Sequence, residues 1–211
     1  AKTLPASSHF EANPNFRSAI IMLGAHLVNR YVVTACLLGA CVLFSLVGCF
    51  TFINLYLAHS PYDLGTGALA NIFAVYLVGV IITPLSTILL RRFGSARTII
   101  GAVIISIMGV LLTLASPLWL IVIGLGIMSS GVFVTQSATI SYIAVNVHQG
   151  RSLASGLYYL FYYAGGTLGA WLCGLAYAQG QWRLTVWLLL LVQVLALLIA
   201  TFGMIKTNKA A

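Results

Sequence analysis

Long runs of apolar residues without any charge dominate the sequence, and they restrict the folds open to the chain. One of these runs, residues 152–178, exceeds the roughly 20 apolar residues that cross the hydrocarbon core of a bilayer. Of the 211 residues, 61% are hydrophobic and only 6% are charged, whereas soluble domains carry about 25% charged residues. The sequence therefore predicts an integral membrane protein.

Six apolar segments can be distinguished, at residues 31–57, 68–90, 98–115, 118–145, 152–178 and 183–205. Lipid offers the backbone no hydrogen-bond partners, so each segment is expected to cross as a helix. The predicted fold is thus an all-α integral membrane bundle of six transmembrane helices over residues 30–205. Residues 1–29 are predicted to be a linker, in which residues 16–29 form either an interfacial helix or an ordinary connector. Residues 206–211 form a tail.

Polar residues are distributed unevenly over the six segments. Segments 98–115 and 183–205 carry few polar groups and are predicted to be lipid-facing or peripheral. The pattern of two segments with many polar residues followed by one with few polar residues therefore occurs twice along the chain. This is the pattern expected of two inverted three-helix repeats.

The basic residues predict how the bundle is oriented in the membrane. With the N-terminus in the cytoplasm, only Arg183 of the ten Lys and Arg residues falls outside. The nine on the inside are Lys2, Arg17, Arg30, Arg91, Arg92, Arg97, Arg151, Lys206 and Lys209. By the positive-inside rule, the linker, the tail and hence both termini are predicted to be cytoplasmic. The net charge of +8 is then explained by orientation and contact with anionic lipid, and no nucleic-acid partner is expected.

Ionisable chemistry is sparse in the predicted spans. The two acids, Glu11 and Asp63, lie outside them, and the four cysteines all lie inside apolar runs. There is no nucleophile–base pair, phosphate-binding loop or metal-ligand spacing. We therefore expect no enzyme, no metal and no cofactor, and we interpret the cysteines as small core residues.

Uncharged polar residues within the spans are the candidates for lining a substrate cavity. Hydroxyl and amide groups of this kind bind polar groups of a ligand, while aromatic rings cover its apolar faces. The alternative is that they hydrogen-bond only between helices. The candidates are Thr51, Asn54, Asn71, Tyr76, Gln136, Tyr158 and Tyr162.

Segment 152–178 shows three faces when its residues are placed at about 100° per residue. One face holds Tyr158 and Tyr162 together with Gly165 and Gly169, whose GxxxG spacing favours close helix packing. Tyr159 and Tyr163 lie on a third face. The first face is apolar and is predicted to meet lipid; it comprises Leu157, Leu160, Ala164, Leu168, Trp171 and Leu175.

Three stretches resemble the C-terminal half of transporters of the major facilitator superfamily. They are LPASSHF at residues 4–10, GCFTFINLY at residues 48–56 and GRSLASGLYYLFYYAGGTLGA at residues 150–170. The stretches are more narrowly similar to the branch of sugar-efflux and drug–proton antiporters. The resemblance implies one half of a twelve-helix fold in a bacterial inner membrane, with an N-terminal six-helix half as partner. It also implies proton-coupled efflux of a small organic molecule by alternating access.

Residues 87–97 occupy the place of the superfamily's cytoplasmic loop motif, G-x-x-x-D-R-x-G-R-R. Arg92 and Gly94 match it, whereas Arg91 stands at the Asp position and Ser95–Ala96 at the basic pair. The resemblance therefore implies a remnant formed by Arg91, Arg92, Gly94 and Arg97. The alternative is that these arginines only anchor the loop on the inside.

Two other functions remain open from the sequence. The chain could be a complete six-helix protein that dimerises through Gly165 and Gly169, or a non-transporting scaffold or fragment. The polar segment that starts at Ala1 favours a piece of a longer protein.

Overall fold

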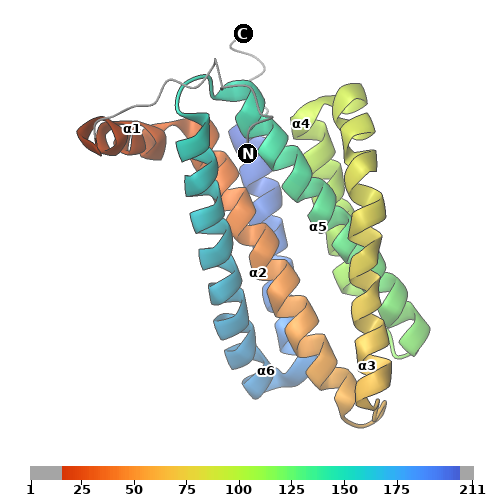
Figure 1. The fold of residues 1–211 in the computed structure, drawn as a ribbon. Coiled ribbons are helices and arrows are strands. Elements are labelled where there is room, and N and C mark those ends of the chain that lie inside the picture. Colours follow the sequence, from red (N-terminus) through yellow and green to blue (C-terminus); the bar gives the residue numbers. More distant parts are fainter. Residues whose placement is uncertain (1–15, 205–211) are drawn as a thin grey trace, which may run out of the picture.

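The computed structural model describes residues 16–204, which fold into helices with no strand in that range. Figure 1 shows the long helices running side by side as a bundle. The predicted all-helical class is confirmed. The described residues do not include most of the predicted linker (residues 1–15), nor Ile205 and the predicted tail that follows it.

Two of the long helices match predicted segments closely. Helix α2 (Arg30–Ala58) begins after Asn29, whose side chain accepts a hydrogen bond of 2.9 Å from the Tyr31 amide and so caps the helix. Helix α5 (Leu118–Asn146) begins after Pro117, which is extended and leads directly into its first turn. Local capping and turn residues thus set both starts.

The other long helices each combine two predicted segments around a break. Helix α4 (Val78–Leu112) is interrupted at Gly94, where φ is 75° and ψ is 167°. Helix α6 (Arg151–Met204) is interrupted at Gly180 and Gln181. The chain reverses direction at both breaks (Figure 1). Because L-residues with a side chain rarely adopt positive φ, glycine suits the reversal at position 94.

The predicted segment 68–90 is less regular than expected. It starts as α3 (Thr66–Phe73), continues as one tight turn of 3₁₀ helix, η1 (Ala74–Leu77), and then enters α4. Nothing in the apolar periodicity predicted this turn. It matters because it carries Tyr76, one of the candidate residues.

Small residues hold the helices together in two pairs. Helix α2 packs most extensively against α6, and α4 packs most extensively against α5. At Gly109 of α4, an added Cβ would lie 2.6 Å from the Gly124 carbonyl oxygen of α5. At Gly203 near the end of α6, it would lie 2.7 Å from the Thr34 methyl group of α2. These contacts leave no space for side chains, so the backbones approach closely.

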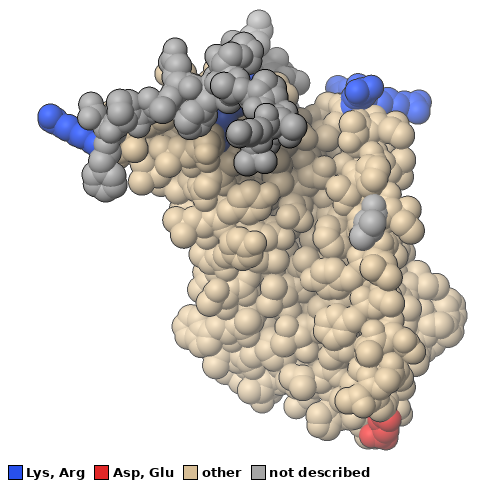
Figure 2. All heavy atoms as spheres, viewed as in Figure 1, with Lys and Arg blue, Asp and Glu red and all other residues tan. Residues whose placement is uncertain are grey.

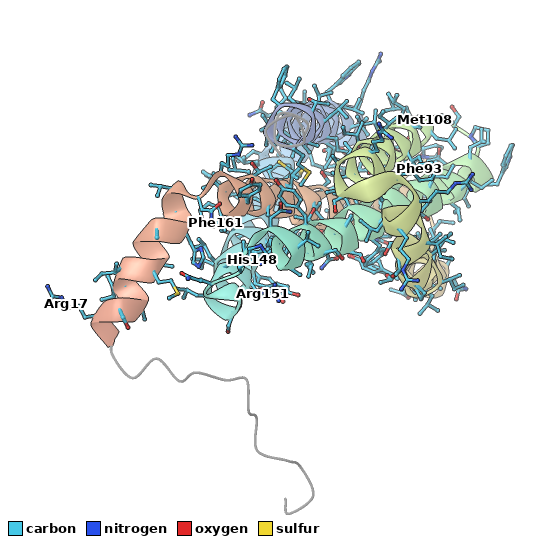
Figure 3. The ribbon with its side chains drawn as sticks, turned by 90° about the horizontal axis from the view of Figure 1, so that it is seen from above. Arg17, Phe93, Met108, His148, Arg151 and Phe161 are labelled. Carbon is cyan, nitrogen blue, oxygen red and sulfur yellow. The ribbon has the colours of Figure 1, made fainter. Side chains whose placement is uncertain are left out.

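Of the two alternatives for residues 16–29, the structure shows a helix, α1 (Phe16–Val28). It projects sideways from one end of the bundle, with Arg17 toward its far end (Figure 3). Its side chains Ile21 and Val28 are 65% and 83% exposed. The helix thus carries apolar surface at the end of the bundle where the arginines gather.

Charge is confined to the two ends of the bundle. On the face shown in Figure 2, basic residues lie at one end, the acidic residue at the other, and the surface between them is uncharged. Large apolar side chains are exposed on the helices, including Trp171 at 61% and Phe202 at 64%. Leu160, Leu168 and Leu175 of the predicted lipid face are also exposed. Leu157 is not, since it is 6% exposed and belongs to the core.

Candidate functional site

Three of the seven candidate residues come together from three different elements. The side chains of Gln136 of α5 and Tyr76 of η1 both lie in the neighbourhood of the Tyr162 side chain of α6. We call these three residues the Tyr–Gln cluster. Gln136 and Tyr76 are half-buried, and Tyr162 is 7% exposed. The cluster therefore offers an amide and two phenol groups at the edge of the core.

Aromatic packing fixes the position of Tyr76. Its ring lies 4.6 Å from the Phe50 ring of α2 and 5.7 Å from the Phe133 ring of α5, measured between centroids. Phe133 in turn covers Gly79, where an added Cβ would lie 2.8 Å from the Phe133 Cζ atom. A hydrogen bond of 2.7 Å between the hydroxyls of Ser86 and Ser137 holds α4 to α5. The apolar rings and this bond explain why η1 stays against α5.

Tyr158 lies deeper in the core than Tyr162, which is itself 7% exposed. It is fully buried, and its ring fills the space over Gly39 of α2, where an added Cβ would lie 2.5 Å from the Tyr158 Cε2 atom. The rings of Tyr158 and Tyr162 are stacked with centroids 5.9 Å apart. Tyr158 therefore supports Tyr162 from within the core.

Two exposed tyrosines beside the cluster were not among the candidates. Tyr159 is 40% exposed and Tyr163 is 64% exposed, and their rings stack with centroids 6.4 Å apart. Tyr159 and Tyr163 both make edge contacts with Tyr162. The helical periodicity had placed them together on a third face, which was the signal that could have identified them.

The remaining polar candidates are Thr51, Asn54 and Asn71. Thr51 and Asn71 are exposed. Asn54 is half-buried, and its amide donates a hydrogen bond of 2.6 Å to the Phe50 carbonyl of its own helix. Asn54 thus satisfies part of its hydrogen-bonding capacity locally.

Gly165 and Gly169 pack within the chain, against α2. An added Cβ at Gly165 would lie 2.5 Å from the Cα atom of Ala40, and one at Gly169 would lie 2.5 Å from the Phe44 carbonyl oxygen. The predicted packing role is therefore satisfied inside the bundle. The same glycine surface is not free to serve as a dimer contact.

The loop-motif residues form an exposed basic turn. Arg91, Arg92 and Arg97 are all exposed around Gly94, and the Arg92 guanidinium lies 5.4 Å from the Phe93 ring centroid. Within residues 16–204 the single acid is Asp63, which lies at the opposite end of the bundle. No described carboxylate therefore neutralises this turn.

The structure reveals a polar core that the sequence interpretation missed. Gln193 of α6 donates a hydrogen bond of 3.0 Å to the Ser106 hydroxyl of α4, and both residues are buried. With Ser45 of α2 and Thr135 of α5 they line a cavity of about 20 Å³. The segments 98–115 and 183–205 are thus not merely peripheral, because each supplies a polar group to the core. A lone glutamine in an apolar span was the available signal, since a buried amide needs a partner.

The small cavity has the properties of a water site. The Ser45 hydroxyl and the Gln193 amide oxygen have no hydrogen-bond partner among the described residues. A cavity of this size can hold one water molecule, which requires two to four polar partners. One water would join all four long helices through hydrogen bonds.

Sequence comparisons relate the chain to membrane transporters. An uncharacterized transporter of Buchnera aphidicola subsp. Schizaphis graminum is 28% identical over 166 residues, which cover 78% of this chain and 40% of the relative. YybF, an uncharacterized MFS-type transporter of Bacillus subtilis, is 28% identical over 180 residues, covering 85% of this chain and 45% of the relative. An uncharacterized transporter of B. aphidicola subsp. Baizongia pistaciae is 24% identical over 180 residues. No family profile matches the chain.

The chain therefore spans less than half the length of the curated relatives it matches. In residues 16–204, four helices are long and apolar enough to cross a membrane. These helices and the transporter relatives together identify the chain as an integral membrane protein.

Proposed function

We propose that the chain is the C-terminal half of a secondary transporter of the major facilitator superfamily, and that the Tyr–Gln cluster contributes to its substrate cavity. The observation that supports this proposal most strongly is the Tyr–Gln cluster itself, which is polar but uncharged. It joins η1, α5 and α6 at the edge of the core, in a chain similar to transporters about twice its length. The N-terminal half would close the cavity from the other side.

The bundle is proposed to cross the membrane six times. The apolar spans Thr66–Leu112 and Arg151–Met204 contain 47 and 54 residues. At about 1.5 Å per residue each is more than twice as long as the roughly 30 Å hydrocarbon core. Breaks at Gly94 and at Gly180–Gln181 would divide each span into two crossings.

Two inverted three-helix repeats are supported by the packing. Residues 30–112 and residues 118–204 would each supply three crossings. The first crossing of one repeat, α2, packs against α6 of the other, and α5 packs reciprocally against α4. The first helix of each repeat thus packs against the other repeat, as expected for two repeats related by an axis in the membrane plane.

The proposed orientation places both termini in the cytoplasm of a bacterial cell. Arg17 and Arg151 lie at the same end of the bundle (Figure 3), and the turn around Gly94 is at this end in Figure 1. Arg183 follows the break of α6 at the opposite end. The positive-inside rule then assigns the arginine-rich end to the cytoplasmic side of the inner membrane.

The residues of the cluster suggest how a substrate would bind. The Gln136 amide can donate and accept hydrogen bonds, and each tyrosine hydroxyl can do both. The exposed rings of Tyr159 and Tyr163 would cover apolar parts of the molecule. We infer a small organic substrate with hydroxyl or amide groups. If efflux is coupled to protons, as in the sugar-efflux and drug–proton branch, the coupling carboxylate belongs to the other half, since Asp63 lies in a loop.

Export can be tested without knowing the substrate. The full-length protein would be overproduced in bacteria, and the growth medium would be compared with that of an empty-vector strain by untargeted mass spectrometry. We expect at least one small organic compound to accumulate in the medium, and a protonophore to abolish the accumulation. Identical media from cells that contain folded protein in the membrane would contradict the proposed efflux.

A further inference from the structure

A surface cavity lies on the opposite side of α5 from the Tyr–Gln cluster. It is a crevice of about 430 Å³ between the two halves of α4, with α5 as its floor, a volume in the range of ligand pockets, roughly 300–1,000 Å³. Val134 lines the crevice, and it is only two residues from Gln136. At about 100° per residue their side chains point to nearly opposite sides of the helix.

Both halves of α4 are fixed to α5 beside the crevice. The Ser86–Ser137 hydrogen bond of 2.7 Å holds the first half. Gly131 of α5 holds the second half, since an added Cβ would lie 2.8 Å from the Ser106 amide nitrogen. Gly101, which lines the crevice, leaves open space, with no atom within 4 Å of an added Cβ.

The lining is apolar except at one end and at Ser130, whose hydroxyl donates a hydrogen bond of 2.7 Å to the Gly126 carbonyl of its own helix. Ile82, Leu85 and Leu89 line it from the first half of α4, and Ile105 lines it from the second. Leu85 is 46% exposed and Ile105 is 48% exposed, so the crevice is accessible from the side of the bundle. An elongated apolar group entering from the bilayer would be covered along its length.

The polar end carries positive charge and an unsatisfied hydroxyl. Arg97 and Thr98 both line the crevice there. Thr98 is 6% exposed, and its hydroxyl has no hydrogen-bond partner among the described residues. Arg91 and Arg92 are exposed in the same turn, with no carboxylate of residues 16–204 at this end. A buried hydroxyl beside a guanidinium is suited to bind an anion.

We propose that this crevice binds one anionic phospholipid from the leaflet that surrounds the Arg91–Arg97 turn. One acyl chain occupies the apolar part. The phosphate accepts hydrogen bonds from Arg97 and from the Thr98 hydroxyl, which thereby gains the partner it lacks. The assignment needs only a membrane-embedded bundle, so it stands or falls independently of the transported substrate.

The test is lipid binding by the full-length protein in neutral detergent, measured by native mass spectrometry. Phosphatidylglycerol and phosphatidylcholine with identical acyl chains are compared. We expect one phosphatidylglycerol to be retained at least about tenfold more strongly than phosphatidylcholine, a ratio equal to about 1.4 kcal/mol. Equal retention of the two lipids, or competition by glycerol phosphate alone at equal concentration, would overturn the proposal.

Two variants with matched controls locate the site. Arg97→Gln is expected to remove the preference for phosphatidylglycerol. Arg92→Gln is expected to keep this preference, because Arg92 lies outside the crevice. Gly101→Leu fills the crevice and is expected to prevent retention of either lipid. Gly156→Leu is its control, because Gly156 is also helical with open space around it. Retention of phosphatidylglycerol by folded Gly101→Leu protein at the wild-type level would place the lipid elsewhere.

Discussion

Replacing Gly165 by alanine is expected to destabilise the bundle strongly, although only one methyl group is added. That methyl group would lie 2.5 Å from the Cα atom of Ala40, and a backbone atom cannot rotate away as a side chain can. Helices α2 and α6 would have to separate along their principal contact. Overpacking of this kind costs about 1–3 kcal/mol. The expected result is a lower midpoint of thermal unfolding in detergent, with less folded protein recovered from membranes.

Gly156→Ala is the matched control for this experiment. Gly156 lies in the same helix but has no atom within 4 Å of an added Cβ. There the gain in helix propensity, about 1 kcal/mol, should leave the midpoint unchanged or raise it. Equal midpoints for the two variants would contradict the close packing of α2 on α6.

Gln136→Leu is expected to lower export of the substrate at least about tenfold, because loss of one hydrogen bond to a bound ligand costs 1–3 kcal/mol. Leucine has a similar size but cannot hydrogen-bond a polar group of the substrate. Tyr162→Phe should have an effect in the same direction, since it removes a hydroxyl group from the same cluster. The rate of accumulation in the medium, normalised to protein in the membrane, measures both.

Tyr177→Phe controls for loss of a tyrosine hydroxyl in the same helix. Tyr177 packs on Phe52, with ring centroids 5.5 Å apart, away from the cluster. Its substitution should leave export unchanged. If Gln136→Leu and Tyr162→Phe exported at the wild-type rate, the cluster would have only a structural role.

Local sequence was sufficient to predict the helical class and the positions of the apolar segments. Lipid solvation requires long apolar helices, and this requirement is visible in any window of about 20 residues. Turn residues such as Pro117 then mark where α5 begins. The 3₁₀ turn η1 was not predictable, because it depends on Phe50 and Phe133 holding Tyr76 from two other helices.

The site was predicted in part, for a related reason. Helical periodicity correctly placed Tyr158 and Tyr162 on one side of their helix, but it does not reveal which neighbour covers that side. Gly39, more than a hundred residues earlier, leaves the space that Tyr158 fills. The Gln193–Ser106 hydrogen bond likewise joins residues 87 positions apart. Contacts over such distances follow from the fold and not from spacing along the chain.

The central claim is that the face carrying Tyr159 and Tyr163 borders a water-filled cavity, while the opposite face of the same helix meets lipid. Tyr163 and Leu168 provide a suitable pair, because they are 64% and 47% exposed, only five residues apart, and about 140° apart around the helix axis. The four native cysteines are buried and give little background reactivity. Each position would be replaced by cysteine in the full-length protein.

The decisive measurement is the reaction rate of these two thiols with a membrane-impermeant methanethiosulfonate reagent, applied to either side of native membranes. The thiolate is the reactive form, so a thiol in lipid reacts slowly, and we predict that Tyr163→Cys reacts at least about tenfold faster than Leu168→Cys. Equal rates at the two positions would contradict a water-filled cavity on this face and with it the proposed transporter half.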